Sequence, residues 1–233
     1  MQVNPPGADG APRMVVVGAG PAGVRAAQTL LRHGVRPVIV DEAALPGGQI
    51  YRQGAAPRGS ARQRYGFEWK RAQAIHAAGA DLAARADYRA ATAVWNAAPG
   101  SLDLVRHGEL ETLPYSRLLL ATGATDRVLP FPGWTLPGVY TLGGAQIALK
   151  SQGCTFGPRI VFAGTGPLLY LVAYQYARAG AQVQAVLDCA PPGSQVRAAP
   201  ALLSQPGMLA KGMYYLGWLR ARGTSRGDRV AAY

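Results

Sequence analysis

Residues 14–41 read MVVVGAGPAGVRAAQTLLRHGVRPVIVD, and this stretch decides the fold. It contains two short apolar runs, 14–17 and 37–40, which are typical of strands buried on both faces. Residues 22–32 between them favour a helix. Gly34 suits the position just past that helix, where a left-handed conformation is cheap only for glycine. The order strand, helix, strand predicts a βαβ unit in a parallel sheet.

The glycines between the first strand and the helix have the spacing G-x-G-x-x-G. Gly18 permits a tight turn, Gly20 lets a pyrophosphate approach the backbone, and Gly23 allows close packing of helix on strand. The helix N-terminus offers N–H groups to phosphates. Asp41 ends the second strand, 23 positions after Gly18, and can accept hydrogen bonds from a ribose. Together these features predict dinucleotide binding rather than a plain glycine-rich turn.

Composition indicates a globular protein. The chain has 233 residues, 49% of them hydrophobic, which is enough for one large domain or two small ones. Its net charge is +12, but the arginines are scattered along the chain and form no basic block with interleaved aromatics. We therefore predict no nucleic-acid binding. Residues 1–13 contain no signal sequence, and Cys154 and Cys189 form no redox or metal motif, so we predict a cytoplasmic protein without a metal.

The segment after the first βαβ unit is predicted to hold a loop, a helix and an antiparallel insert. Residues 46–52, PGGQIYR, form either a backbone that approaches a bound group or an ordinary surface loop, and the sequence leaves both open. The other predicted elements are a flexible stretch at 53–59, a helix at 67–82, and a β-hairpin or meander of Tyr88–Asn96 and Ser101–Arg106 around Pro99-Gly100.

The same pattern restarts in the second half of the chain. Residues 118–120 predict a further strand, and a connection rich in Pro and Gly follows at 130–138. Residues 160–163 then predict a strand that leads to Gly164 and Gly166, with Leu169 in place of the third glycine. Asp188 follows 24 positions after Gly164. This second turn either serves the fold alone or binds a nicotinamide or adenine nucleotide. The uncharged run 160–177 fits strand, turn and helix better than a membrane span.

The two openings, the antiparallel insert and the Ala-Thr-Gly after the strand at 118–120 resemble the two-dinucleotide-binding flavoproteins related to pyridine nucleotide-disulphide reductases. PGGQIYR at 46–52, the stretch 121–141 and GTGPLL at 164–169 are similar to FAD-binding subunits of D-hydroxyproline dehydrogenase, opine oxidase, hydrogen cyanide synthase and sarcosine oxidase (its alpha chain). The resemblance implies an α/β fold, with a Rossmann-like FAD-binding domain that carries an antiparallel β insert. The start of a second Rossmann-like domain of the NAD(P) type follows.

The resemblance also implies site residues. The pyrophosphate of FAD would contact Gly18, Gly20, Pro21, Ala22 and Gly23, and the adenosine ribose would contact Asp41, beside Glu42. Gly48 and Gln49 would lie along the flavin, and Val94 would meet adenine through its backbone. The flavin half would be closed by Ala121, Thr122 and Gly123, and NAD or another adenine nucleotide at the second site would contact Gly164 and Gly166. No residue stands out as catalytic.

The resemblance implies an FAD-dependent subunit of a heteromeric dehydrogenase that oxidises an amine or imino acid. Disulphide reduction is excluded, because the chain has no C-x-x-C or C-x-x-x-x-C pair. A short-chain NAD dehydrogenase is disfavoured, because no Tyr-x-x-x-Lys pair occurs. A nucleotide-binding or assembly subunit without its own catalysis is the alternative.

The chain is expected to be a shortened copy of a longer subunit, with weak flavin retention and poor solubility. Residues 224–233 show no apolar pattern, and only two clear parallel strands are predicted in the second half. The predicted parts are a leader at 1–12, an FAD-binding domain at 13–127, a connection at 128–158, an incomplete second dinucleotide domain at 159–220 and a tail at 221–233.

Overall fold

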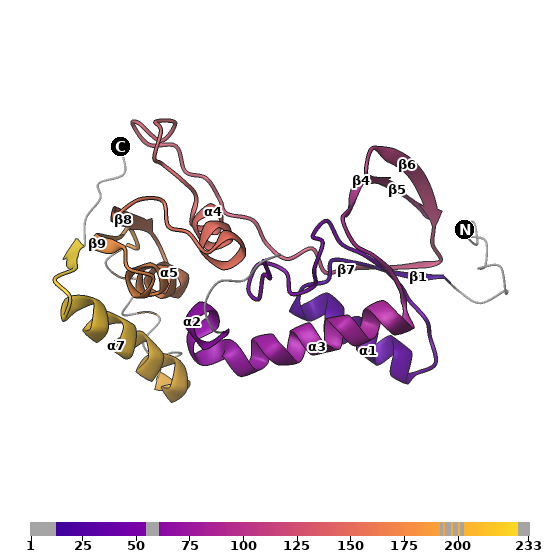
Figure 1. Cartoon of the computed structure of the whole chain (residues 1–233), viewed down its shortest axis with the longest axis horizontal. Helices are drawn as coiled ribbons and strands as arrows, with labels where there is room; N and C mark the ends of the chain where they lie inside the picture. The colour runs from indigo at the N-terminus through magenta and orange to yellow at the C-terminus, as the bar shows by residue number, and fades with distance from the viewer. Residues whose placement is uncertain are drawn as a thin grey trace. The chain divides into compact units, whose positions relative to one another are not determined.

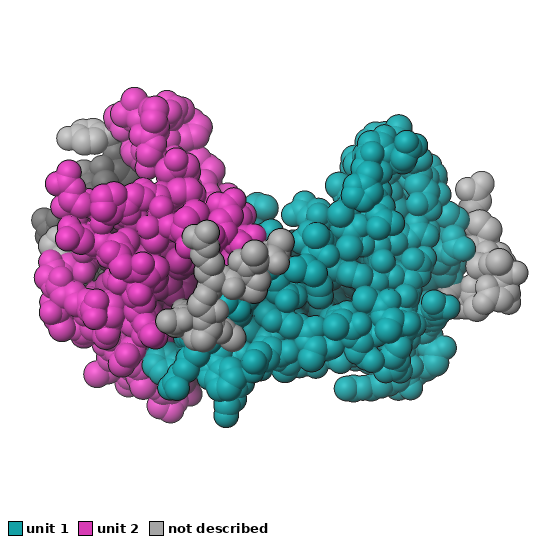
Figure 2. Space-filling view, in the orientation of Figure 1, with its two compact units in different colours: residues 1–125 teal, residues 126–233 magenta. Residues whose placement is uncertain are grey.

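The structure, a computed structural model, describes residues 13–54, 61–191 and 203–227, together with Gly193, Arg197 and Pro200. The chain divides into two compact units, residues 1–125 and 126–233, which Figure 2 draws in teal and magenta. The predicted leader at 1–12 lies outside the described residues, as do residues 55–59 of the predicted flexible stretch.

The first unit is built on a four-stranded sheet in the order β3-β2-β1-β7. All neighbouring strands are parallel, and Val16 of β1 pairs with Ile39 on one side and Leu119 on the other. Val16 and Ile39 are almost fully buried, which explains why the sequence reads as continuous apolar runs. The strands are β1 (Met14–Val17), β2 (Val38–Val40), β3 (Asp87–Arg89) and β7 (Arg117–Leu120).

Helices cover one face of this sheet and an antiparallel insert covers the other (Figure 1). Ala27, Ile39 and Leu82 belong to the helix-side core, whereas Val40 and Leu102 belong to the insert-side core. The helices are α1 (Pro21–Arg32), α2 (Ala61–Tyr65), the 3-10 turn η1 (Gly66–Glu68) and α3 (Trp69–Arg85), and the insert contains β4 (Thr92–Ala98), β5 (Ser101–Arg106) and β6 (Glu109–Pro114).

The prediction of one strand over Tyr88–Asn96 is wrong. The chain turns at Ala91, which has a positive φ of 51°, and its N–H donates to the carbonyl of Ala43 at 3.2 Å. The residues before this turn pair with β2 in the parallel sheet, and those after it pair with β5 in the insert. The stretch therefore serves two sheets.

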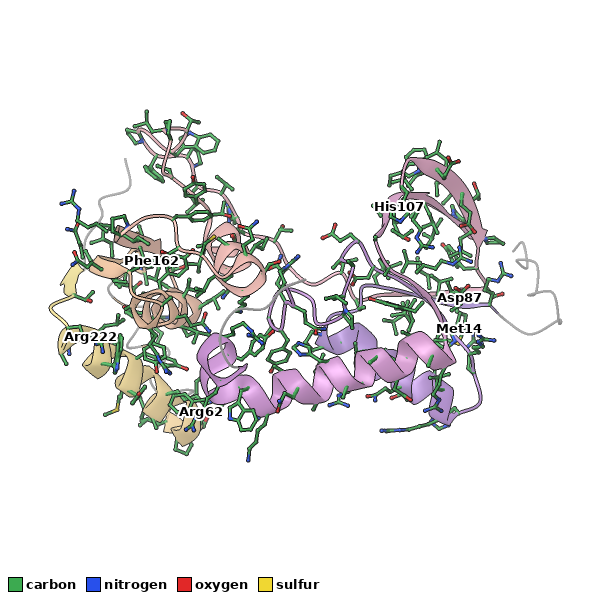
Figure 3. The ribbon with its side chains drawn as sticks, viewed as in Figure 1. Met14, Arg62, Asp87, His107, Phe162 and Arg222 are labelled. Atoms are coloured by element: carbon green, nitrogen blue, oxygen red, sulfur yellow. The ribbon has the colours of Figure 1, made fainter. Side chains whose placement is uncertain are left out.

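The second unit repeats the βαβ arrangement around its own core. Phe162, Val172, Tyr176 and Val186 pack together, and the rings of Phe162 and Tyr176 meet edge to face at 5.4 Å (Figure 3 labels Phe162). The strands are β8 (Arg159–Gly164), β9 (Gln182–Asp188) and β10 (Ser225–Gly227), and the helices are α4 (Leu142–Ile147), the π-helical turn η2 (Ala148–Gln152), α5 (Pro167–Arg178) and α7 (Pro206–Arg220).

The expectation of only two parallel strands in this unit is also wrong. The segment 225–227 adds the third strand, β10, in a sheet of order β10-β9-β8, and Arg226 pairs with Val186. Parallel pairing uses backbone N–H and C=O groups, so it does not need the apolar pattern whose absence suggested an unstructured tail.

The uncharged run 160–177 forms β8, a turn and α5, as predicted. None of the helices in the described ranges has the length and apolar character needed to cross a bilayer.

Candidate dinucleotide-binding site

The turn between β1 and α1 is packed so closely that two of its glycines cannot be replaced. Gly18 has φ 104°, and a Cβ there would lie 2.8 Å from the carbonyl carbon of Ala121. A Cβ on Gly23 would overlap the carbonyl oxygen of Gly18. Gly20 differs, because its Cβ would meet Gly48 Cα at an ordinary 3.6 Å. The fold itself therefore leaves room for a Cβ at Gly20, unlike at Gly18 and Gly23.

Helix α1 begins in a way that suits an anion. Gly20 is the N-cap and provides no side chain to cap the helix, and Pro21 occupies the first helical position. The first turn contains no acidic residue. The N–H groups of Ala22 and Gly23 and the positive end of the helix dipole are thus directed at the space beside Gly20.

Asp41 connects the end of β2 to this turn. Asp41 is nearly buried, with 9% of the residue exposed. One carboxylate oxygen, Oδ2, accepts a short hydrogen bond from the N–H of Ala19, and Oδ1 accepts from the N–H of Ala43 at 2.7 Å. Each carboxylate oxygen has a further lone pair, so Asp41 can still accept from a ribose hydroxyl. The glycine-rich turn and the carboxylate of Asp41 therefore form one hydrogen-bonded unit.

The other predicted residues of the first site differ in their exposure and in how closely they pack against the glycine-rich turn. Ala121 lies against Gly18, and Gly48 lies against Gly20, so both belong to the turn's immediate surroundings. Val94 follows Thr92, whose N–H donates to the carbonyl of Asp41 at 2.9 Å. Four further predicted residues are exposed: Glu42, Gln49, Thr122 and Gly123.

Tyr88 is a neighbour of this site that sequence reasoning missed. Its hydroxyl is buried and has no hydrogen-bond partner among the described residues. Burial, and secondarily the charge of Asp41, raises the pKa of Tyr88 to about 12. The alternating pattern placed Tyr88 on a strand, but nothing in it signalled proximity to Asp41.

The second glycine-rich turn, between β8 and α5, has the same spacing and a different interior. Leu169 is 1% exposed, and its Cδ1 lies 3.8 Å from the position a Cβ on Gly164 would take. Asp188 accepts from the N–H of Ala190 at 3.0 Å and from the hydroxyl of Tyr170 at 2.8 Å. The structure thus brings Gly164 and Asp188 to one turn, while Gly166 is exposed.

Other reactive side chains lie elsewhere. His107 is at the turn between β5 and β6, at the end of the insert (Figure 3). The two cysteines are exposed and unpaired. Within the described ranges, no group of three or more His, Cys, Asp or Glu side chains could hold a metal. A shallow hollow lined by Gln28, Leu31 and Arg85 lies between α1 and α3 and includes no residue of the glycine-rich turn between β1 and α1.

Comparison with known proteins gives a consistent result over most of the chain. The family model described as "Pyridine nucleotide-disulphide oxidoreductase" matches residues 12–199. The chain is 39% identical to the A subunit of opine oxidase from Rhizobium meliloti (strain 1021) over 220 residues, covering 90% of this chain and 46% of that protein. It is also 39% identical to the HcnB subunit of hydrogen cyanide synthase from Pseudomonas aeruginosa over 213 residues, covering 91% and 46%. The chain therefore spans about half the length of these relatives.

Solved structures share the fold at lower identity. The flavoprotein disulfide reductase RclA from Escherichia coli, as a Cu(II) complex, superposes with a TM-score of 0.59 and 22% identity, covering 95% of this chain and 49% of that chain. L-proline dehydrogenase from P. horikoshii superposes with a TM-score of 0.58 and 21% identity, covering 76% and 35%.

Proposed function

Because the chain belongs to the pyridine nucleotide-disulphide oxidoreductase family, we propose that it is a subunit of an FAD-dependent oxidoreductase whose first unit binds FAD. One observation carries this proposal. The buried carboxylate of Asp41 is hydrogen-bonded to Ala19 in the phosphate turn, so the acceptor for a ribose and the donors for a pyrophosphate are fixed relative to each other. A site held in its bound geometry loses less entropy when the ligand binds.

The residues of the first unit divide the work of holding the cofactor. Gly20 leaves room for the pyrophosphate, the start of α1 provides N–H donors, and Asp41 accepts from the adenosine ribose. Asp41 and the exposed Glu42 also place negative charge where a 2′-phosphate would lie, which disfavours NADP. Gly48, Ala121 and the residues that follow them would line the flavin side. When bound, FAD supplies the electron-accepting chemistry.

The substrate we propose is an amine or imino acid of the D-hydroxyproline, opine or sarcosine type, oxidised within a heteromeric dehydrogenase. Support comes from the relatives, which are the A subunit of opine oxidase, the HcnB subunit of hydrogen cyanide synthase and, at 31% identity over 197 residues, the alpha subunit of sarcosine oxidase from Rhizobium meliloti (strain 1021). We place this activity in the cytoplasm, in keeping with two exposed thiols that are not paired.

A second candidate is a nucleotide-binding subunit that assembles a complex without its own catalysis. The segment 128–140 of the second unit favours it, because it exposes several large apolar side chains. These are Val128, Leu129, Phe131, Trp134, Leu136, Val139 and Tyr140, each at least 41% exposed. Apolar side chains clustered on a surface often mark a contact with another protein. Anaerobic reduction of FAD bound to this chain by an amine substrate, with the partner subunits present, would favour the catalytic role, and unreduced FAD would favour assembly.

The ribose contact provides the test of the first site. We expect Asp41→Ala to weaken FAD binding about tenfold or more, since a hydrogen bond to a charged group contributes about 1.5–3 kcal/mol. Asp81→Ala is the matched control, because Asp81 is an exposed carboxylate on α3 that pairs with Arg85. Affinity is measured by FAD titration. AMP should also displace FAD better than 2′,5′-ADP does. Unchanged FAD affinity in Asp41→Ala would remove the ribose assignment.

A further inference from the structure

The loop 46–52 lies directly against the first phosphate turn. The N–H of Gly47 donates to the carbonyl of Ala19 at 2.8 Å, and a Cβ on Gly48 would lie 2.8 Å from Gly20 Cα. Both loop glycines have positive φ, 128° and 58°, so the backbone reaches this position only because no side chain is present. The turn that would receive the pyrophosphate therefore has a second backbone segment as its wall.

Helix α3 holds this wall from the other side. Pro46 packs on Gly79, where a Cβ would lie 2.6 Å from Pro46 Cβ. Farther along the loop, Nε2 of His76 lies 2.8 Å from the carbonyl oxygen of Tyr51. Because a carbonyl only accepts, Nε2 of His76 carries the hydrogen and donates it. Two residues one helical turn apart on α3 thus hold the loop at both of its ends.

Two further side chains, Tyr65 and Gln53, hydrogen-bond to backbone carbonyls at the two ends of the loop. Tyr65 donates from its hydroxyl to the carbonyl of Arg52 at 2.9 Å, and its ring packs edge-on to the ring of His76 at 5.6 Å. Gln53 donates from its side-chain amide to the carbonyl of Pro46 at 2.8 Å, which closes the loop on itself. The backbone position of the loop is therefore fixed by side chains that lie beyond the phosphate turn.

We propose that His76 and Gly79 are positioning residues for the first dinucleotide site. Together with Pro46 and Tyr51 they form a latch, which keeps Gly47 and Gly48 against Ala19 and Gly20. The proposal rests on the FAD-binding function proposed above and adds two residues that touch no ligand. If these contacts of α3 with the loop are lost, Gly47 and Gly48 no longer stay packed against Ala19 and Gly20. The site is then less preorganised for the dinucleotide, which dissociates faster.

Two substitutions open the latch in different ways. Gly79→Ala pushes Pro46 away by steric overlap, although alanine itself favours the helix over glycine. His76→Leu removes the hydrogen bond to Tyr51, whereas His76→Gln keeps a donor near the position of Nε2. The matched control is Gly212→Ala in α7, where a Cβ meets nothing within 4 Å, so only helix propensity changes.

The measurement is the dissociation rate of FAD from the full chain, followed by the rise in flavin fluorescence at a temperature where circular dichroism shows every variant folded. We expect Gly79→Ala and His76→Leu to release FAD about tenfold faster than the unchanged chain. His76→Gln should remain within about threefold of it, and Gly212→Ala should match it.

The possible failures are distinct. If the unchanged chain does not bind FAD saturably, the proposed function fails, and the latch fails with it. If the unchanged chain binds FAD but Gly79→Ala and His76→Leu release it at the normal rate, the latch alone is wrong. Equal rates for His76→Leu and His76→Gln would also overturn it, because the hydrogen bond would then not matter. Should Gly79→Ala fail to fold, the two His76 variants decide the question.

Discussion

In the first unit, α1 approaches the glycine-rich turn so closely that Gly23 has no room for a side chain. In the second unit, α5 carries Leu169 at the corresponding position, and this side chain packs beside Gly164 of the turn. A Cβ on Gly23 would lie 2.9 Å from the carbonyl carbon of Gly18, so no side chain fits there. At the second turn, Leu169 is part of the hydrophobic core. Proline is the first helical residue in both units. The first two glycines have the same spacing in both turns, and the third position, Gly23 or Leu169, separates the two packings.

The acids that follow the two turns, Asp41 and Asp188, also differ in their hydrogen-bond partners. Asp41 and Asp188 each accept from the N–H two residues later, at 2.7 and 3.0 Å. The other oxygen of Asp41 accepts from the backbone of the phosphate turn, whereas that of Asp188 accepts from the hydroxyl of Tyr170. A ribose at the second turn would have to share Asp188 with this hydroxyl. The comparison supports the proposal that the first turn binds the dinucleotide, and it shows that side chains of the second unit occupy the corresponding positions at the second turn.

Of the predicted changes, the largest is the loss of stability expected when Gly23 is replaced by leucine, the residue at the corresponding position of the second turn. Gly23→Leu gives the first turn the residue found in the second, and its side chain must displace the backbone of Gly18. We expect a loss of about 4 kcal/mol or more in the free energy of unfolding, typical of severe overlap with a backbone. Urea denaturation followed by circular dichroism measures it. Gly212→Leu, at an open position of α7, is the control. A change below about 1 kcal/mol relative to that control would contradict the described packing.

Much of the first unit could be predicted from the sequence because its signals are local. Buried parallel strands read as apolar runs, and the tight turn and its acid have a characteristic spacing. Residues 14–17 and 118–120 accordingly form the expected strands, and the helix before Gly34 ends where predicted.

The remaining features depend on contacts between distant residues. His76 and Tyr51 are 25 positions apart, and Tyr170 and Asp188 are 18 apart, so no local pattern reports either hydrogen bond. Tyr88 alternates like a strand residue in either sheet, which is why the change of sheet at Ala91 was not predicted. The strand at 225–227 pairs with β9 through its backbone, and its sequence has no apolar signature.

A smaller effect, on the affinity of the second turn for NAD, is expected when Asp188 loses its hydrogen bond from Tyr170. Tyr170→Phe frees one oxygen of Asp188, and we expect NAD to bind this unit about threefold more tightly as a result. Equilibrium dialysis in a Gly20→Val background restricts the measurement to the second turn. Tyr176→Phe is the matched control. It also removes a tyrosine hydroxyl from α5, but this hydroxyl donates to the carbonyl of Ala145 and not to Asp188. Unchanged or weaker NAD binding in Tyr170→Phe, or an equal gain in Tyr176→Phe, would show that Tyr170 does not compete for the acid.

The central claim is that the first turn, and not the second, binds FAD. It is tested most directly by the number of FAD molecules bound per chain at saturation in the twin variants Gly20→Val and Gly166→Val, measured by dialysis and visible absorbance. A Cβ at Gly20 would meet Gly48 Cα at an ordinary contact distance of 3.6 Å, so the fold tolerates it, but the side chain blocks the approach of a pyrophosphate. Gly166 has φ 85°, so valine there strains the second unit as well as blocking its turn. The account predicts one FAD per chain for the unchanged protein and for Gly166→Val, and none for Gly20→Val. One FAD bound to folded Gly20→Val, or its loss from Gly166→Val alone, would contradict it.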